Sequence, residues 1–213
     1  IRLGHDFLTF VLRPIHEAGR PHPSAAARKD LSRTAIVLQG PIMHQFDFTL
    51  YTVRRYRQMF PTALIILSTW DTEVGLNKFH ALCEIVTSDE STVPKVPYNA
   101  NHQMKSSSEG ILRARELGAE FVLKTRTDQR MYDPFSISAL LSFLRAFPPN
   151  KGCQQTSRLI TLSLNSFFYR PYGISDQFTF GRVEDMLSYW NGYIDEISSV
   201  ANVSRRTIGE EEW

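Results

Sequence analysis

Cysteine is scarce in this 213-residue sequence, and neither Cys83 nor Cys153 has a metal-ligand spacing around it. The six histidines are scattered, again without a pair at ligand spacing. These absences argue against a disulfide framework and against a structural zinc site. Two thiols in a chain of this length suggest a reducing compartment.

Long hydrophobic runs and an excess of one charge are also missing. No apolar run approaches the roughly 18 residues of a membrane-spanning helix, and the start of the sequence has no signal-peptide pattern. The 24 basic and 22 acidic side chains leave a net charge of +2, which is too balanced to indicate a nucleic-acid-binding surface. We therefore expect no nucleic-acid partner.

Three common sequence motifs of nucleotide-binding proteins and hydrolases are absent as well. The sequence contains neither the Gly-x-Gly-x-x-Gly pattern of dinucleotide-binding folds nor the Gly-x-x-x-x-Gly-Lys-Ser/Thr pattern of phosphate-binding loops. It also lacks the Gly-x-Ser-x-Gly turn that presents the nucleophile of many serine hydrolases. None of these three classes is therefore supported by a motif.

The sequence does contain short apolar runs that alternate with segments of helical periodicity, and 42% of its residues are hydrophobic. Such an alternation predicts an α/β fold with a mostly parallel, doubly wound sheet. We expect residues 1–32 to be an N-terminal extension or linker and 33–213 to form one domain. The expected strands are 34–38, 63–67, 84–87, 121–123 and 176–181, and the expected helices are 47–60, 74–82, 101–117, 137–147 and 183–190.

Polar side chains follow three of the expected strands, at the point where each strand ends. Because the carboxyl ends of parallel strands share one edge of a sheet, we expect these side chains to bind a ligand there. An aromatic ring for a base, a carboxylate for ribose hydroxyls and cations for phosphates suit a nucleotide. The residues are Gln39, Gly40 and Pro41, then Trp70 and Asp71, then Lys124, Arg126 and Asp128.

Asn101 and Gln103 stand at the start of an expected helix whose N-terminus should point at the same edge. Helix N-termini favour anions, so we add both residues to the expected donor-binding set. Simpler interpretations stay open, because Asn101 could cap the helix and Trp70 could be a core aromatic. Lys124 could likewise face the sheet, since it precedes the turn of the loop.

Five short motifs, taken in order, resemble the WavE family of lipopolysaccharide-synthesis proteins; they are residues 34–41, 68–70, 101–103, 122–128 and 175–181. The resemblance covers residues 33–192 or so. It implies a glycosyltransferase-like protein with a GT-A-like fold, in which a Rossmann-like, mostly parallel sheet is flanked by helices. A nucleotide half near 33–150 would then join a smaller acceptor-side region near 151–213.

The resemblance also implies a function. The protein would move a sugar from a nucleotide-sugar donor to a glycan or glycolipid acceptor in lipopolysaccharide-type surface polysaccharide synthesis. It would act in the cytoplasm, at the cytosolic face of a membrane, through peripheral association or as a module fused to other glycosyltransferase modules. Two other classes stay open, namely a non-catalytic nucleotide- or glycan-binding domain and a metal-dependent nucleotidyltransferase.

A metal site follows only from the resemblance. GT-A enzymes carry an Asp-x-Asp motif at this strand end, and here Arg126 stands in place of the first carboxylate while Asp128 matches the second, the usual metal ligand. We favour Mn²⁺ or Mg²⁺ held by Asp128 with help from phosphates and water. In the alternative, Lys124, Arg126 and Arg130 neutralise the diphosphate without a metal. In a third interpretation, Asp128 only orders the turn through a salt bridge to Arg126 or Arg130.

Asp176 is the expected catalytic base. A GT-A enzyme that inverts configuration needs a carboxylate near the acceptor hydroxyl, supplied from the second half of the domain. The residue follows an aromatic, arginine-bearing loop, where Tyr169, Arg170 and Tyr172 suit stacking on a sugar ring of the acceptor. The simpler interpretation is that Asp176 caps a turn before the next strand.

Overall fold

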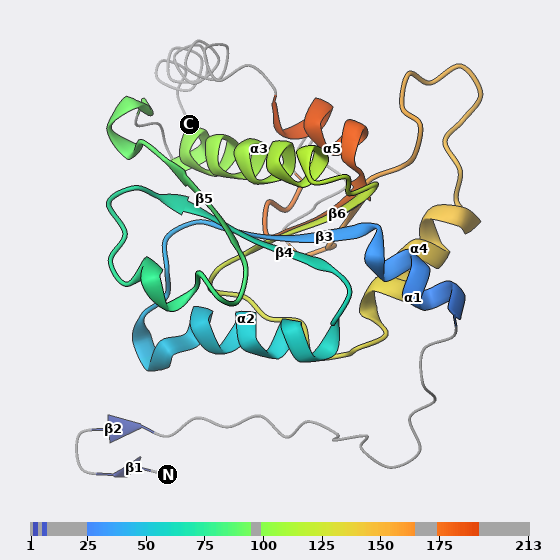
Figure 1. Cartoon of the computed structure of the whole chain (residues 1–213). Helices are drawn as coiled ribbons and strands as arrows, with labels where there is room; N and C mark the ends of the chain where they lie inside the picture. Colours follow the sequence, from blue (N-terminus) through green and yellow to red (C-terminus); the bar gives the residue numbers. More distant parts are fainter. Residues whose placement is uncertain (1, 4–5, 8–24, 95–98, 165–173, 192–213) are drawn as a thin grey trace, which may run out of the picture.

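A computed structural model describes residues 2–3, 6–7, 25–94, 99–164 and 174–191. Most of its strands form one six-stranded sheet in the order β5-β4-β3-β6-β8-β7 (Figure 1). A separate antiparallel pair joins β1 (Arg2–Leu3) and β2 (Asp6–Phe7). The strands of the large sheet are β3 (Thr34–Gln39), β4 (Leu64–Trp70), β5 (Glu84–Ser88), β6 (Phe121–Arg126), β7 (Ile160–Thr161) and β8 (Phe178–Arg182).

The first four strands of this order are parallel, and β8 and β7 extend the sheet in antiparallel fashion. The prediction of a mostly parallel α/β sheet is therefore confirmed. All six residues of β3 are buried, which explains their continuous apolar run, because a central parallel strand is covered on both faces. The division into a nucleotide half and an acceptor half stays a prediction.

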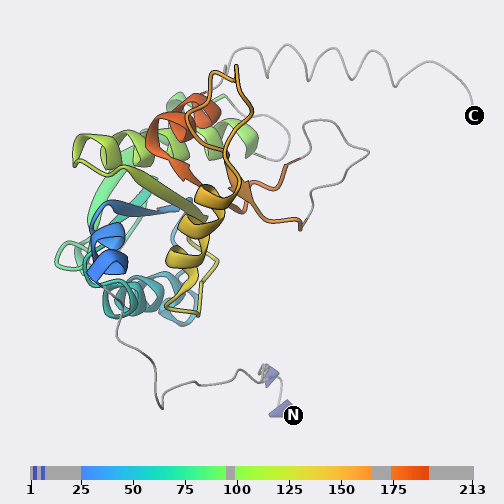
Figure 2. The same cartoon turned by 90° about the vertical axis from the view of Figure 1, so that its right-hand side faces the viewer.

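Helices cover both faces of the sheet. The turned view shows α3 and α5 on one face and α2 on the other (Figure 2). The segment expected as a helix at 74–82 forms only the short 3₁₀ turn η2, which starts after Gly75 in the left-handed conformation (φ 75°). The helical elements are α1 (Ala25–Ser32), η1 (Gln45–Asp47), α2 (Phe48–Met59), η2 (Leu76–Lys78), η3 (Glu90–Thr92), α3 (Ala100–Glu116), α4 (Ser136–Ala146) and α5 (Val183–Trp190).

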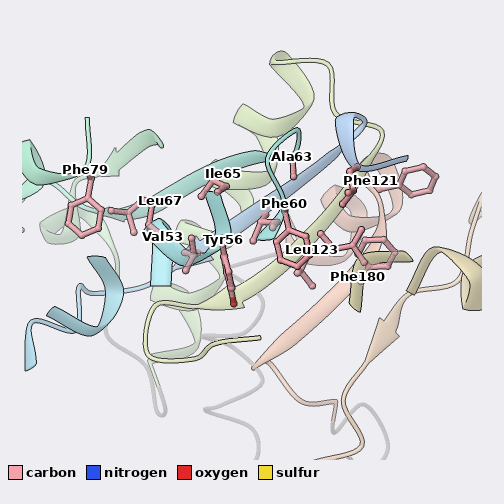
Figure 3. Close-up of a cluster of buried hydrophobic side chains, with 14 of the residues drawn as sticks. Val53, Tyr56, Phe60, Ala63, Ile65, Leu67, Phe79, Phe121, Leu123 and Phe180 are labelled. Atoms are coloured by element: carbon pink, nitrogen blue, oxygen red, sulfur yellow. The ribbon is translucent and has the colours of Figure 1, made fainter. Parts of the chain in front are cut away.

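Two apolar clusters hold these layers together. On the α2 face, Tyr56 and Phe60 are fully buried and pack with Leu123 of β6 and Phe180 of β8 (Figure 3). On the opposite face, side chains of α3 and α5 pack on β3, β4 and β6. Burial of an aromatic or aliphatic side chain contributes about 1.5–3 kcal/mol, so these two clusters stabilise the packing of the helices on the sheet. Among the described helices, none is both long enough and apolar enough to cross a membrane.

Candidate functional site

A cavity of about 500 Å³ lies at the carboxyl ends of β3, β4 and β6. Its size falls within the range of about 300–1,000 Å³ that is usual for small-molecule sites. This is the sheet edge at which the sequence predicts a ligand, because parallel strands present their carboxyl ends together. The lining residues are Gln39, Gly40, Pro41, Ile42, Met43, Trp70, Thr72, Glu73, Glu90, Asn99, His102, Gln103, Arg126, Thr127 and Asp128.

Arg126 and Asp128 form a two-pronged ion pair at one wall of this cavity. Nε of Arg126 donates to Oδ1 of Asp128 at 2.9 Å, and Nη2 donates to Oδ2 at 2.6 Å. These hydrogen bonds lower the pKa of Asp128 from its ordinary value and raise that of Arg126. Both oxygens of the carboxylate are therefore engaged by one guanidinium.

The same guanidinium also faces Asp176. Nη1 of Arg126 lies 3.7 Å from Oδ2 of Asp176. Asp176 comes within reach because β8 runs antiparallel to β6, with Phe178 opposite Thr125, so the residues just before β8 lie beside the carboxyl end of β6. One arginine thus stands between two carboxylates from different parts of the chain.

Lys124 does not line the cavity. Its side chain is fully buried on the α5 side of the sheet, where Nζ lies 4.2 Å from the centre of the Trp190 ring and donates to the main-chain oxygen of Asp176. Burial lowers the pKa of this ammonium to about 7. The structure therefore gives Lys124 a partner in the Asp176 segment instead of the expected position at a donor phosphate.

Two further residues of the expected donor-binding set lie outside the cavity lining. Asp71 is exposed, and its backbone N–H donates to the carbonyl of Ser88 at 3.0 Å. Asn101 is fully buried, and its Nδ2 donates to the carbonyl of Pro94 at 3.0 Å. The helix N-cap is Asn99, so Asn101 ties the start of α3 to the preceding loop.

A hydrogen-bond chain fixes the amide of Gln39 at the end of β3. Ser106 of α3 donates through Oγ to the carbonyl of His102 at 2.7 Å, which leaves Oγ free to accept. Gln39 Nε2 donates to that oxygen at 2.9 Å. The other amide atom, Oε1, is therefore oriented as an acceptor, and it is buried without a partner among the described residues.

The family model for WavE lipopolysaccharide synthesis matches residues 34–208. The chain belongs to this family. Membership connects this WavE-family protein with lipopolysaccharide synthesis and with a biosynthetic role.

Other comparisons add little about this WavE-family protein. No curated protein matches the chain. Among solved structures, it is similar to the bifunctional IspDF from Campylobacter jejuni, with 12% identity and a TM-score of 0.42 over 84% of the chain. The chain spans about half, 48%, of the length of that protein. A likeness at this level carries no argument about function.

Sequence reasoning about this WavE-family protein missed three ionisable residues of the cavity lining, His102, Glu73 and Glu90. His102 is 9% exposed, its ring centre lies 5.2 Å from that of Trp70, and its Nδ1 has no partner in the described part of the chain. The sequence offered one indication of this role, because His102 lies between Asn101 and Gln103, which were both predicted to bind the donor. Glu73 and Glu90 come from turns instead of strand ends, so no strand pattern marked them. Tyr169, Arg170 and Tyr172 lie outside the described residues.

The described residues do not fit a bound divalent ion as they stand. Asp128, the implied ligand, already gives both oxygens to Arg126. Glu73 accepts from the backbone N–H of Ile42 at 2.8 Å, and Glu90 accepts from the hydroxyl of Thr72 at 3.1 Å. Within the described ranges, no three His, Cys, Asp or Glu side chains converge as ligands. A metal would first have to displace Arg126, so Mn²⁺ or Mg²⁺ stays a prediction.

Proposed function

We propose that this WavE-family protein is a glycosyltransferase that moves a sugar from a nucleotide-sugar donor to a glycan or glycolipid acceptor during lipopolysaccharide synthesis. One observation carries the proposal. Arg126 and Asp128 line the cavity, and Asp176 stands just outside the lining, 3.7 Å from Arg126, so a cation for a departing diphosphate and a carboxylate for an acceptor hydroxyl stand side by side.

The cavity supports binding of the donor nucleotide. Gly40 adopts a φ of 111°, which glycine tolerates best, and its backbone follows the end of β3 directly into the cavity wall. The carboxylates of Glu73 and Glu90 offer acceptors for ribose hydroxyls, and the guanidinium of Arg126 offers donors for phosphate oxygens. Gln39 Oε1 offers a further acceptor for a polar group of the donor.

The proposed reaction uses Asp176 as general base. Asp176 takes the proton of an acceptor hydroxyl while the hydroxyl oxygen attacks the anomeric carbon of the donor sugar. The bond from that carbon to the diphosphate breaks, and its electron pair leaves with the diphosphate. Arg126 exchanges its carboxylate partners for phosphate oxygens and stabilises the developing negative charge. Attack from the face opposite the leaving group inverts the anomeric configuration.

A non-catalytic nucleotide- or glycan-binding domain is the second candidate, and the Arg126–Asp128 pair favours it. Both oxygens of Asp128 already accept hydrogen bonds from Arg126, so neither ion of the pair needs a metal or a diphosphate as a partner. In that case the cavity would bind a ligand without promoting transfer. The two candidates differ in what a change at Asp176 does.

Donor binding is tested by thermal unfolding of the purified chain with UDP-, GDP-, CMP- and dTDP-sugars, each with and without Mn²⁺. A ligand at about 100 times its dissociation constant adds about 2.7 kcal/mol to the free energy of unfolding. We expect one nucleotide sugar to raise the melting temperature, Arg126→Gln to abolish the rise, and Asp71→Asn, an exposed change outside the cavity, to retain it. If none of the four stabilises the chain, the donor site is refuted.

Catalysis is tested with the stabilising donor and a glycan acceptor. Asp176→Asn should abolish sugar transfer while the donor-induced melting shift persists, because the amide cannot accept the proton. Transfer that survives in Asp176→Asn would remove this residue as the base. Donor binding without transfer to any acceptor would favour the binding-domain candidate, and pyrophosphate release from a nucleoside triphosphate would indicate a nucleotidyltransferase.

A further inference from the structure

The outer surface of α2 combines exposed aromatic side chains with arginines. The twelve residues of α2 include no Asp or Glu, and the residues that face the sheet are buried. At its start, Phe46 is 92% exposed, and Tyr51 on the helix is 54% exposed. We call this surface the arginine–aromatic patch, and its residues are Phe46, Tyr51, Arg54, Arg55, Arg130 and Tyr132.

Two of the three arginines of the patch, Arg55 and Arg130, stack on aromatic rings. The guanidinium carbon of Arg130 lies 4.8 Å from the ring centre of Tyr51, and that of Arg55 lies 5.6 Å from the ring centre of Tyr132. The hydrogen bonds of Arg130 go to neutral groups, the hydroxyl of Thr52 and the carbonyl of Phe48.

Among the residues that the structure describes, none of Arg54, Arg55 and Arg130 pairs with a carboxylate. Their charge is thus concentrated on one surface of a chain whose net charge is only +2. Such a surface attracts anions, and the attraction acts over a Debye length of about 8 Å at physiological salt.

We propose that the arginine–aromatic patch docks on an anionic lipid bilayer. Arginine side chains place their apolar stems along the acyl boundary and their charged ends among headgroups, and tyrosine suits the same interface. A soluble anion would account for the arginines alone. It would leave Phe46 unexplained, a large apolar side chain almost wholly in water on a backbone with a φ of 54°. A bilayer accounts for both features, because it buries the ring and neutralises the charges.

The first turn of α2, which carries Tyr51 of the patch, also contacts the cavity wall through its buried side. Met43 lines the cavity, and its backbone N–H donates to the hydroxyl of Thr49 in the first turn of α2. That hydroxyl in turn donates to the carbonyl of Thr127 at 3.0 Å, next to Asp128. Docking would therefore hold the cavity close to the lipid surface, where a lipid-linked acceptor would be anchored. This last step rests on the proposed function, whereas the docking does not.

Co-sedimentation of the purified chain with vesicles tests the proposal. We expect binding to vesicles of phosphatidylglycerol and phosphatidylcholine in equal parts, little binding to pure phosphatidylcholine, and weaker binding at higher salt. Arg54→Ala should lower the partition coefficient about fivefold, the effect of one basic residue near an anionic surface. Phe46→Ala should lower it by a similar factor. Both side chains are exposed, so the melting temperature should stay unchanged.

Matched controls come from the opposite face of the sheet. Arg115→Ala and Leu117→Ala remove one exposed cation and one exposed apolar side chain at the end of α3, and both should bind vesicles like the unchanged chain. Failure of the unchanged chain to bind anionic vesicles overturns the proposal, as does equal loss in the controls. A loss with Arg54→Ala but not with Phe46→Ala would indicate a site for soluble anions and would also overturn it. No nucleotide sugar is needed, so the result is independent of the donor-binding test.

Discussion

The buried ammonium of Lys124 donates a hydrogen bond to the main-chain carbonyl of Asp176. Two positions further along β6, Arg126 approaches the carboxylate of that same residue, at 3.7 Å. Side chains at alternate positions of a strand share one face, which is why both cations reach residue 176. One strand therefore positions both the backbone and the side chain of the proposed base.

Replacing Lys124 by methionine should lower kcat and leave donor affinity unchanged. Methionine fills a similar apolar volume against Trp190 but cannot hold the carbonyl of Asp176. A misplacement of about 1 Å at a reacting group can cost about 100-fold in rate. We expect a loss of that order in sugar transfer, with the donor-induced melting shift retained.

A stability control separates positioning from general destabilisation. Ile137→Val removes one methylene from a fully buried position on α4, on the other face of the sheet, and should cost about 1 kcal/mol. It should leave kcat unchanged. Equal kcat in Lys124→Met and Ile137→Val would show that the Lys124–Asp176 hydrogen bond does not position the base.

Lys124 should also make the stability of the protein depend on pH. Burial lowers its pKa from 10.5 to about 7, so between these values the unfolded chain binds the proton and the folded chain does not. The free energy of unfolding therefore rises with pH in this window, by at most about 1.4 kcal/mol per pH unit. Urea unfolding of the unchanged chain and of Lys124→Met near pH 7 and pH 9 measures this. The free energy of unfolding of the unchanged chain, relative to that of Lys124→Met, should be higher at pH 9 than at pH 7. An equal difference at the two pH values would contradict the lowered pKa of Lys124.

The parallel part of the sheet could be predicted because a strand that is buried on both faces appears in the sequence as a continuous apolar run. β3 and β6 are covered on both faces, and that environment requires apolar runs such as Val122–Leu123. The direction of β8 could not be predicted in the same way. Its alternation of Phe178 and Phe180 marks a strand, but side-chain alternation is the same whether a strand runs parallel or antiparallel.

The candidate site was predictable where a residue ends a parallel strand and was not where a residue lies further back in a strand or on a turn. Gln39, Trp70 and Arg126 end β3, β4 and β6, and all three line the cavity. Lys124 lies in β6 itself, and its side chain enters the packed layer under α5. Glu73 lies on a turn, and the path of that turn depends on tertiary contacts. One of them is the hydrogen bond that Glu73 accepts from the backbone N–H of Ile42. No sequence motif indicates such a contact.

Arg126→Gln should raise the pKa of Asp128 toward its ordinary value. The two hydrogen bonds from Arg126 are the largest cause of the lowered pKa, and glutamine supplies no charge to replace them. Carbon-13 NMR titration of the carboxylates measures the change directly. Because the folded-state pKa is lowered, the pair stabilises the fold above the ordinary pKa of 3.8 and this contribution is lost as the pH falls.

A matched change elsewhere serves as the control for this titration. Arg145→Gln removes the exposed partner of Asp30 at 2.8 Å and should leave the titration of Asp128 unchanged. If Arg126→Gln also leaves Asp128 unchanged, Arg126 is not its main partner in solution. Asp128 would then be available to a metal ion, and the metal-dependent mechanism would gain support.

Gly110 lets α3 lie directly on the sheet, and its replacement by alanine should destabilise the protein. An added Cβ would stand 2.5 Å from Cγ1 of Val37 and 2.9 Å from Cβ of Ser68. Alanine favours a helix by about 1 kcal/mol over glycine, but overpacking of this kind costs about 1–3 kcal/mol. Urea unfolding should therefore give a lower midpoint for Gly110→Ala, whereas Ser108→Ala, at a half-buried position of the same helix, should keep or raise it. A midpoint for Gly110→Ala that matches the control would mean that α3 can move off the sheet, and the cavity wall formed by His102 and Gln103 would then be adjustable instead of fixed.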